Sequence, residues 1–213
     1  MLHIETFTFN PFQENTYVLS NEEEEAIIVD PGTYFPAEAK SLKDYIFRAG
    51  LQPKLLINTH CHLDHVFGNQ WVSEHYNLEL LIHPKEEEIL AHARKSGEKY
   101  GLPFEDYIGK INFINEGENL QLAEDKLVTI LVPGHSPGSI CLYCQVQNFI
   151  IGGDVLFRES IGRTDLYKGN HEELLQSIKE KLLILPDETI VYPGHGPKTT
   201  IGYEKQNNPF LER

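Results

Sequence analysis

Short segments in which apolar and polar residues alternate open the chain. This pattern is typical of half-buried β-strands, and it covers residues 3–9, 16–19 and 26–29. Further strands are expected at 54–58, 79–82, 119–122, 126–132, 139–146, 148–151 and 189–192. Apolar residues three or four positions apart predict helices at 37–48, 69–76, 84–95 and 172–185. Helices placed between repeated strands favour an α/β fold built from layers of helix and sheet over an all-β sandwich.

Periodicity fades between residues 97 and 117, where Tyr100 and Tyr107 are interleaved with glycines. Loops of this composition often cover functional sites. We therefore expect part of the wall of a binding site in this stretch.

One short stretch, residues 59–68, reads THCHLDHVFG and follows directly on a predicted strand. It places His60, His62, Asp64 and His65 within six residues. Imidazole and carboxylate groups suit zinc, iron or manganese, and the stretch lacks the several thiolates of a structural zinc knot. A metal site is therefore expected at the end of this strand.

Three later motifs complete a recognisable set. His135 lies in PGHSPG, Asp154 in GGD and His195 in PGHGP, each after a predicted strand. The HxHxDH pattern followed by these residues, in this order and over nearly the whole chain, resembles the metallo-β-lactamase superfamily. The resemblance implies a single domain over residues 1–213 with a four-layer αββα sandwich, whose metals lie at one edge between the two sheets.

The same resemblance implies a ligand set for two divalent metal ions, zinc first, with iron or manganese as alternatives. His60, His62 and His135 would hold one ion, Asp64, His65 and His195 the other, and Asp154 would bridge them. A hydroxide bridging the metals would be the nucleophile, because bound metals make hydroxide available at neutral pH. Asp64 and Asp154 are the carboxylates expected to act in catalysis. Asp30, in the turn Asp30-Pro31-Gly32, is either a group supporting the metal site or a plain turn residue.

The bridging aspartate also separates branches of the family. Metallo-β-lactamases proper use a cysteine near the second metal, whereas Asp154 resembles the thioesterase, lactonase and phosphodiesterase branches. Antibiotic hydrolysis is therefore not expected. The run GRTD at residues 162–165 resembles glyoxalase II and persulfide dioxygenases. Arg163 and Lys168 could attract an anionic substrate, or Arg163 could form a structural ion pair with Asp165.

The leading hypothesis is a glyoxalase II-like hydrolase that cleaves a thioester such as S-lactoylglutathione. The helical domain that binds glutathione in glyoxalase II follows the last histidine of the motif, and here the sequence given ends soon after His195, so that domain is expected to be absent. The alternatives are a persulfide dioxygenase with one iron on His60, His135 and Asp154, a lactonase, and a metal-binding scaffold without activity. A complete ligand set argues against the scaffold.

Charge and composition narrow the partners. A net charge of −14 disfavours nucleic acid, which is bound through Lys and Arg, and leaves a small-molecule substrate. No apolar run is long enough for a membrane span and the N-terminus lacks signal-peptide features, so a cytoplasmic location is expected. The acidic run Glu86–Glu88 is expected to be solvated in the first turn of a helix. The sequence leaves the oligomeric state open.

The remaining cysteines and histidines are expected to be structural. Three cysteines, an odd number, argue against a disulfide framework. Cys61 is expected to pack beneath the site, and Cys141 and Cys144 to enter the core from opposite faces of one strand. The histidines outside the motifs are expected to be ordinary surface or packed residues: His3, His75, His83, His92 and His171.

Overall fold

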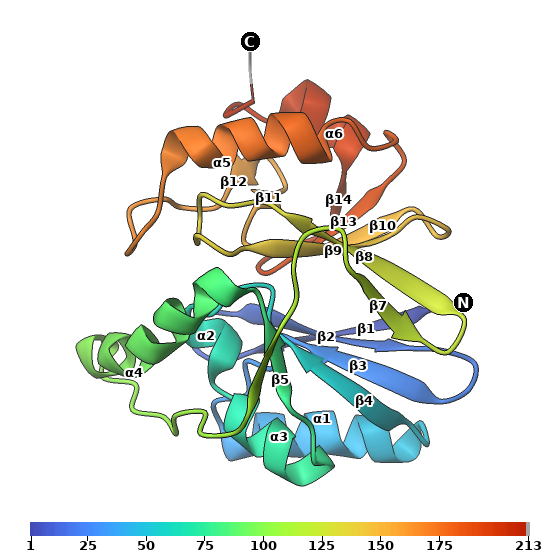
Figure 1. The fold of residues 1–213 in the computed structure, drawn as a ribbon, viewed down its shortest axis with the longest axis vertical. Helices are drawn as coiled ribbons and strands as arrows, with labels where there is room; N and C mark the ends of the chain where they lie inside the picture. Colours follow the sequence, from blue (N-terminus) through green and yellow to red (C-terminus); the bar gives the residue numbers. More distant parts are fainter. Residues whose placement is uncertain (212–213) are drawn as a thin grey trace.

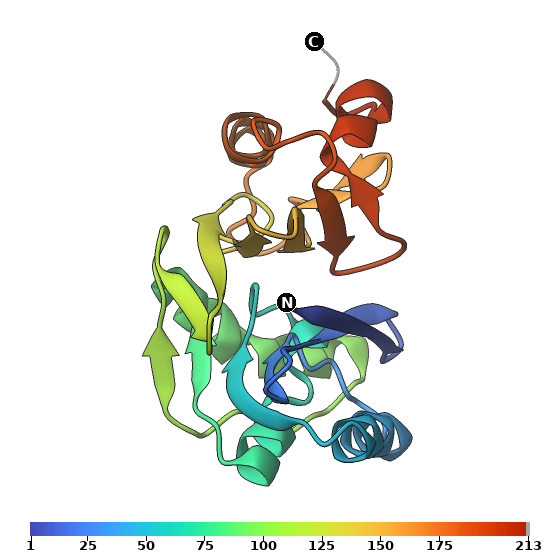
Figure 2. The ribbon, with the colours of Figure 1, turned by 90° about the vertical axis from the view of Figure 1, so that its right-hand side faces the viewer.

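Two six-stranded sheets face each other in the computed structural model, which describes residues 1–211 (Figures 1 and 2). The first sheet contains, in spatial order, β1 (His3–Phe9), β2 (Glu14–Ser20), β3 (Glu25–Val29), β4 (Gln52–Ile57), β5 (Leu80–Ile82) and β6 (Ile111–Phe113). The second contains β14 (Thr199–Thr200), β13 (Ile190–Pro193), β10 (Phe149–Gly153), β9 (Ile140–Cys144), β8 (Asp125–Leu131) and β7 (Asn119–Leu122). A small hairpin joins β11 (Leu156–Phe157) to β12 (Ser160–Ile161).

Helices cover the outer face of each sheet. Against the first sheet lie α1 (Pro36–Arg48), α3 (Asn69–Tyr76) and α4 (Glu87–Tyr100), the last preceded by a 3-10 turn at Pro84–Glu86. Against the second lie α5 (His171–Ser177), its wider continuation Ile178–Leu182, and α6 (Ile201–Asn207). The expected four-layer αββα sandwich is therefore confirmed (Figure 1).

Side chains of the strands point alternately into the core between the sheets and toward the outer helices, as the alternation of apolar and polar residues predicted. Ile27 and Val29 point into the core between the sheets, whereas Ile28 between them packs against the helices outside. From the second sheet, Leu127 and Leu142 complete the core between the sheets. Because consecutive strand residues face opposite sides, one strand serves two cores.

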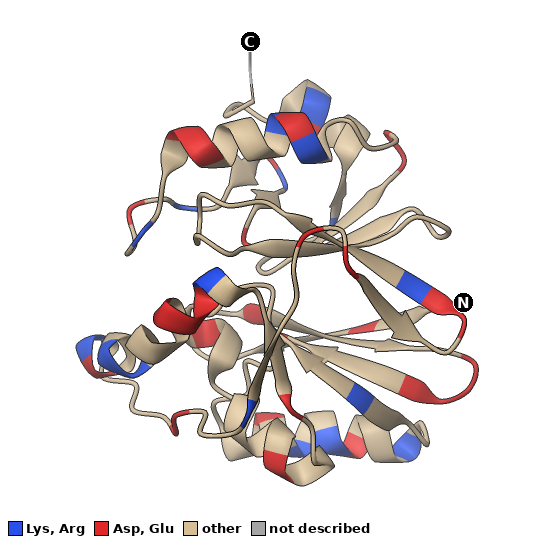
Figure 3. Ribbon diagram, in the orientation of Figure 1, with Lys and Arg blue, Asp and Glu red and all other residues tan. Residues whose placement is uncertain are grey.

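Charged residues gather on the helices and near the ends of strands, and the middles of both sheets are almost free of them (Figure 3). Cys144 packs in the core between the sheets and Cys141 in the core under α5, so their expected opposite orientation is confirmed. Among the helices of residues 1–211, none is both long enough and apolar enough to span a membrane.

Several boundaries differ from those predicted. The helix expected at 84–95 continues to Tyr100, where Gly101 ends it in a left-handed conformation. The sequence pattern missed the shortest elements, including β6, α6 and the one-turn helix α2 (Leu63–Val66). These elements have no clear apolar periodicity of their own, and tertiary contacts decide their conformation.

Candidate metal centre

Seven side chains named from the sequence lie together at one edge between the two sheets. His60 and His62 follow β4, and Asp64 and His65 lie on α2 directly after them. The other three come from loops or strand ends of the second sheet: His135 after β8, Asp154 after β10 and His195 after β13. The site is therefore assembled from both halves of the chain.

Three histidines form the first group. His135 Nε2 lies 2.8 Å from His62 Nδ1 and 3.1 Å from His60 Nε2. One ring nitrogen from each of these residues lies within 4.8 Å of the other two. Nitrogens that converge in this way, from two loops distant in sequence, can hold one metal ion.

A second group joins Asp64, His65 and His195, whose candidate ligand atoms also lie within 4.8 Å of one another. Asp64 Oδ2 is 3.0 Å from His195 Nε2 and 3.7 Å from His65 Nε2. His195 is the most open of the three, with 27% of its side chain exposed, and it faces the cavity described below.

Asp154 touches both groups. Its oxygens lie 3.4 Å from His65 Nε2, 3.5 Å from His195 Nε2 and 3.7 Å from His135 Nε2. Gly194 leaves room for this approach, since a Cβ atom at that position would lie 2.1 Å from Asp154 Oδ1. The glycine of the PGHGP motif therefore allows the strand that carries His195 to pass beside the aspartate.

Three buried polar atoms in this group fit a bound cation. His62 Nε2, His65 Nε2 and Asp154 Oδ1 have no hydrogen-bond partner among the described residues. Buried polar atoms almost always have a partner, so each unpartnered one needs an explanation. The imidazole and carboxylate donors match the preferences of zinc, iron and manganese.

The charge states of His60, His62 and Asp154 suit metal binding, whereas at His65 and His195 burial lowers the pKa but the neighbouring carboxylates Asp64 and Asp154 outweigh it and raise the pKa overall. Burial and the neighbouring histidines lower the pKa of His60, and burial together with His135 lowers the pKa of His62 to about 3. Burial raises the pKa of Asp154, but His65 beside it more than offsets this and the pKa is lowered overall. Neutral imidazole and ionised carboxylate are the forms that bind a metal.

Asp30 lies beneath the second group with a backbone φ of +48°, a region that aspartate tolerates better than most residues. Its Oδ1 accepts a hydrogen bond of 2.7 Å from the Thr59 backbone, and its Oδ2 accepts one of 2.6 Å from the Thr59 hydroxyl. The same Oδ2 is 3.1 Å from His65 Nδ1. Carboxylates placed behind a metal-binding histidine orient its ring. Asp30 has this position relative to His65, and it also begins the segment at which the chain leaves β3.

Glu86 was expected to be solvated, and this was wrong: its side chain is fully buried, while Glu87 and Glu88 are exposed. Its Oε2 accepts a 2.7 Å hydrogen bond from the backbone of Cys61, and its Oε1 accepts one of 2.7 Å from Gly138 and another from the Ser136 hydroxyl. Burial raises the pKa of Glu86, and these donors partly offset that rise. Glu86 therefore ties the loop of His60 and His62 to the loop of His135. Nothing in its run of three glutamates distinguished it.

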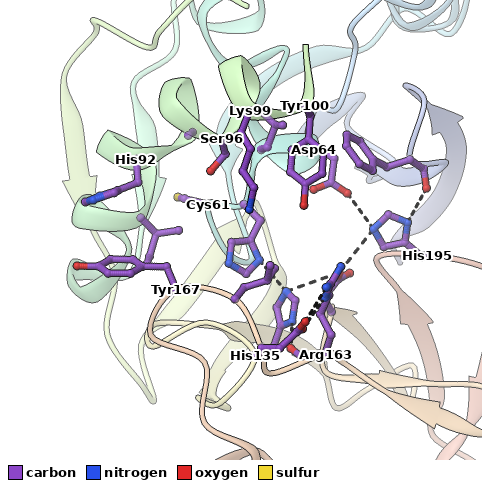
Figure 4. A pocket seen from close by; sticks show the side chains of 18 of the residues that line it. Cys61, Asp64, His92, Ser96, Lys99, Tyr100, His135, Arg163, Tyr167 and His195 are labelled. Atoms are coloured by element: carbon purple, nitrogen blue, oxygen red, sulfur yellow. Dashed lines mark hydrogen bonds and ion pairs between the residues drawn. The ribbon is translucent and has the colours of Figure 1, made fainter. Parts of the chain in front are cut away.

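A cavity of about 570 Å³ opens beside both groups (Figure 4). Helix α4 supplies one wall, and β11, β12 and the loop after them supply the other. The expectation for residues 97–117 holds only for Lys99 and Tyr100, which line the cavity and belong to α4. The wall residues on α4 are Ile89, His92, Ala93, Ser96, Lys99 and Tyr100.

The two basic residues named for substrate binding differ in position. Arg163 lines the cavity and forms a two-point ion pair with Asp165, with distances of 2.7 and 2.8 Å. This pair lowers the pKa of Asp165 to about 2. Lys168 is paired with Glu88 and is not among the residues that line the cavity. The geometry thus matches the ion-pair alternative for Arg163.

Cys61 is buried in the core outside the first sheet and also borders the cavity. Figure 4 shows its sulfur turned away from the cluster of histidines. Of the five histidines outside the motifs, His92 lines the cavity, where its ring stacks on Tyr167 with centroids 4.7 Å apart. No sequence signal distinguished His92 from the others.

Comparison with known proteins decides the family. The sequence model of the metallo-beta-lactamase superfamily matches residues 9–195. The chain belongs to this superfamily. It is 37% identical to the "Hydroxyacylglutathione hydrolase GloC" of Haemophilus influenzae, with 99% of this chain and 98% of GloC covered. The family assignment and the fold expected from the sequence are thus confirmed, and the chain is a hydrolase of the metallo-β-lactamase fold.

Two solved structures are similar throughout. "BLEG-1 B3 metallo-beta-lactamase" has a TM-score of 0.91 at 37% identity, covering 99% of this chain and 100% of its own. "TTHA1623 in a di-iron-bound form" has a TM-score of 0.87 at 34% identity, covering 97% of this chain and 100% of its own. The first of these two structures is named a β-lactamase. The expected lack of antibiotic hydrolysis therefore stays a prediction for this chain.

Proposed function

We propose that this metallo-hydrolase cleaves thioesters of small acidic thiols at a centre of two divalent metal ions. The observation that carries the proposal is the position of Asp154, which contacts members of both ligand groups at the floor of a cavity of about 570 Å³. Cavities of roughly 300–1,000 Å³ are typical of sites for small molecules. The similarity to GloC supports the thioester class, and the di-iron form of TTHA1623 supports two metals.

In this proposal His60, His62 and His135 would hold one ion, and Asp64, His65 and His195 would hold the other. Asp154 would be shared between them, because its oxygens lie within 3.7 Å of His135 in the first group and of His65 and His195 in the second. Bound divalent metals supply an acidified water and a Lewis acid for the substrate carbonyl. Zinc is proposed first, and the same donors accept iron or manganese.

The protein's own groups orient the reactants. Asp64 and Asp154 are the metal-centre carboxylates that line the cavity, so we assign them the orientation of the attacking water and the acceptance of its proton. Asp30 holds the ring of His65 from behind. Leu63, Ile89 and Ala93 give the same cavity an apolar part of its wall.

We also propose that residues 1–213 act as one domain in the cytoplasm. The core between the sheets takes side chains from both halves of the chain, which supports a single folding unit. All three cysteines are buried as free thiols, which suits a reducing compartment. Denaturation in one cooperative transition, and recovery of the protein in the cytoplasmic fraction of its source cells, test these two statements.

The experiment that tests the function compares substrates on metal-loaded protein. Release of free thiol from S-lactoylglutathione is followed beside hydrolysis of a β-lactam and of an acyl lactone, with Asp154→Ala as the inactive control. We expect thioester cleavage with the highest kcat/KM of the three. Cleavage of the lactone or the β-lactam without thioester cleavage would overturn the proposal, as would oxygen uptake with glutathione persulfide.

A further inference from the structure

One face of helix α4 forms a continuous stripe along the cavity. Ile89, Ala93 and Ser96 lie three or four positions apart and line it in turn, and Lys99 continues the stripe at its last turn. Residues at this spacing share one face of a helix. The stripe therefore passes from apolar to polar and ends in a cation. Figure 4 shows Lys99 extending into the space that is also bordered by Tyr100, His135 and Arg163.

The basic residues around this cavity differ in their partners. Arg163 is neutralised by two hydrogen bonds to Asp165, and Lys168 by its pair with Glu88. Within residues 1–211, Lys99 has no carboxylate within 4.0 Å, and its ammonium lies 5.9 Å from the centre of the Tyr100 ring. An ammonium without a carboxylate partner, in a protein with a net charge of −14, is available to bind an anion.

The other charges of the cavity do not compete for Lys99. Its carboxylates are Asp64 and Asp154, which face the histidines, and Asp165, which is held by Arg163. A substrate that places its scissile bond at Asp154 thus meets negative charge on the floor of the cavity and one unpaired positive charge on the helical wall.

We propose that Lys99 determines specificity in this cavity by binding a carboxylate carried by the leaving thiol of the substrate. This inference rests on the proposed thioesterase function and adds a requirement to it. Acyl thioesters of thiols that carry a carboxylate are bound through Lys99, and thioesters of neutral thiols lack that contact. Arg163, already paired, fixes its own loop and does not replace Lys99.

The test uses two acetyl thioesters that differ in the charge of the thiol: the thioester of 3-mercaptopropionate, which is anionic, and that of N-acetylcysteamine, which is neutral. Lys99→Ala should reduce kcat/KM for the anionic thioester by roughly 5- to 30-fold, the range between an exposed ion pair and a charged hydrogen bond. The loss should appear in KM, because the contact is made equally in the ground state and the transition state. Hydrolysis of the neutral thioester should not change.

Lys95→Ala is the matched control, since Lys95 is exposed one turn earlier on α4 and does not line the cavity. A binding measurement adds a readout independent of turnover: the S-ethyl thioether of 3-mercaptopropionate should bind the metal-loaded wild type more tightly than Lys99→Ala by calorimetry. This difference should shrink as salt is raised, because salt screens the exposed charge.

The outcomes separate the two proposals. A wild type that cleaves neither thioester overturns the proposed function and this inference with it. A wild type that cleaves both, with Lys99→Ala unchanged or weakened equally toward both, overturns the role of Lys99 and leaves the thioesterase function standing. An equal loss in Lys95→Ala also overturns it, since the effect would then come from the general charge of the helix.

Discussion

The metal centre and the cavity wall beside it are built in different ways. In the centre, His60, His65 and Asp30 are almost fully buried, and their polar atoms are fixed by neighbours at strand ends. On the wall, Lys99 and Tyr100 project from the last turn of one helix and are exposed. We therefore expect chemistry and specificity to be separable: substitutions in the centre should change the metal site, whereas substitutions on the wall should change which substrate is bound.

The strongest test of this separation is Asp154→Ala. Asp154 lies within 3.7 Å of members of both proposed ligand groups, so we expect turnover to fall by more than about 100-fold, beyond the range for loss of a supporting partner. The fold should persist, because the apolar cores do not include this side chain. Thiol release and circular dichroism on the same sample measure both; substantial activity in this variant would refute the assignment of the bridge.

Asp30→Asn tests whether the support beneath the centre matters. An amide cannot provide both oxygens that Thr59 and His65 now contact, so the ring of His65 should lose its fixed orientation. We expect metal affinity or activity to fall by about 10- to 100-fold. Metal retained after dialysis is the readout, with Asp44→Asn on the exposed side of α1 as the control. Equal metal retention in the two variants would mean that Asp30 is only a turn residue.

Glu86→Gln tests whether this buried glutamate holds the two histidine loops together at the boundary between the centre and the wall. Glutamine keeps the shape but turns an NH₂ group toward Cys61 or Gly138, leaving a buried N–H donor without an acceptor. We expect a loss of about 1–3 kcal/mol in the free energy of unfolding, measured by urea denaturation. Glu87→Gln, one residue later and exposed, should change little. Equal stability of the two variants would show that Glu86 does not hold the two histidine loops together.

The smallest effect is expected for Cys61→Ala. The sulfur is buried among apolar side chains and turned away from the histidines, although the residue lies between two of the proposed ligands. Thioester kcat/KM should change less than about threefold. A large loss of hydrolysis with the metal content unchanged would place this thiol in the reaction and contradict its packing role.

The sequence predicted the centre far better than the wall, for a physical reason. The ligand loops begin where strands end, and the resemblance of the HxHxDH pattern and the three later motifs to the family implied that His60, His135, Asp154 and His195 meet at one edge of the sandwich. Whether these residues bind metal stays a prediction.

The wall could not be read in the same way, because Lys99 on α4 resembles any exposed lysine until the tertiary fold shows which face of the helix borders the cavity. Glu86 was missed for the same reason. Its burial depends on the loops of Cys61 and Gly138, which are distant in sequence.

The metal content of the purified protein tests most directly whether this hydrolase has a centre of two metals. Elemental mass spectrometry is combined, on the same sample, with assays of thioester cleavage and of oxygen uptake with glutathione persulfide. We expect about two divalent ions per chain, as in two-metal hydrolytic sites, together with thioester cleavage. One iron ion per chain with oxygen uptake and no thioester cleavage would contradict it and identify a dioxygenase.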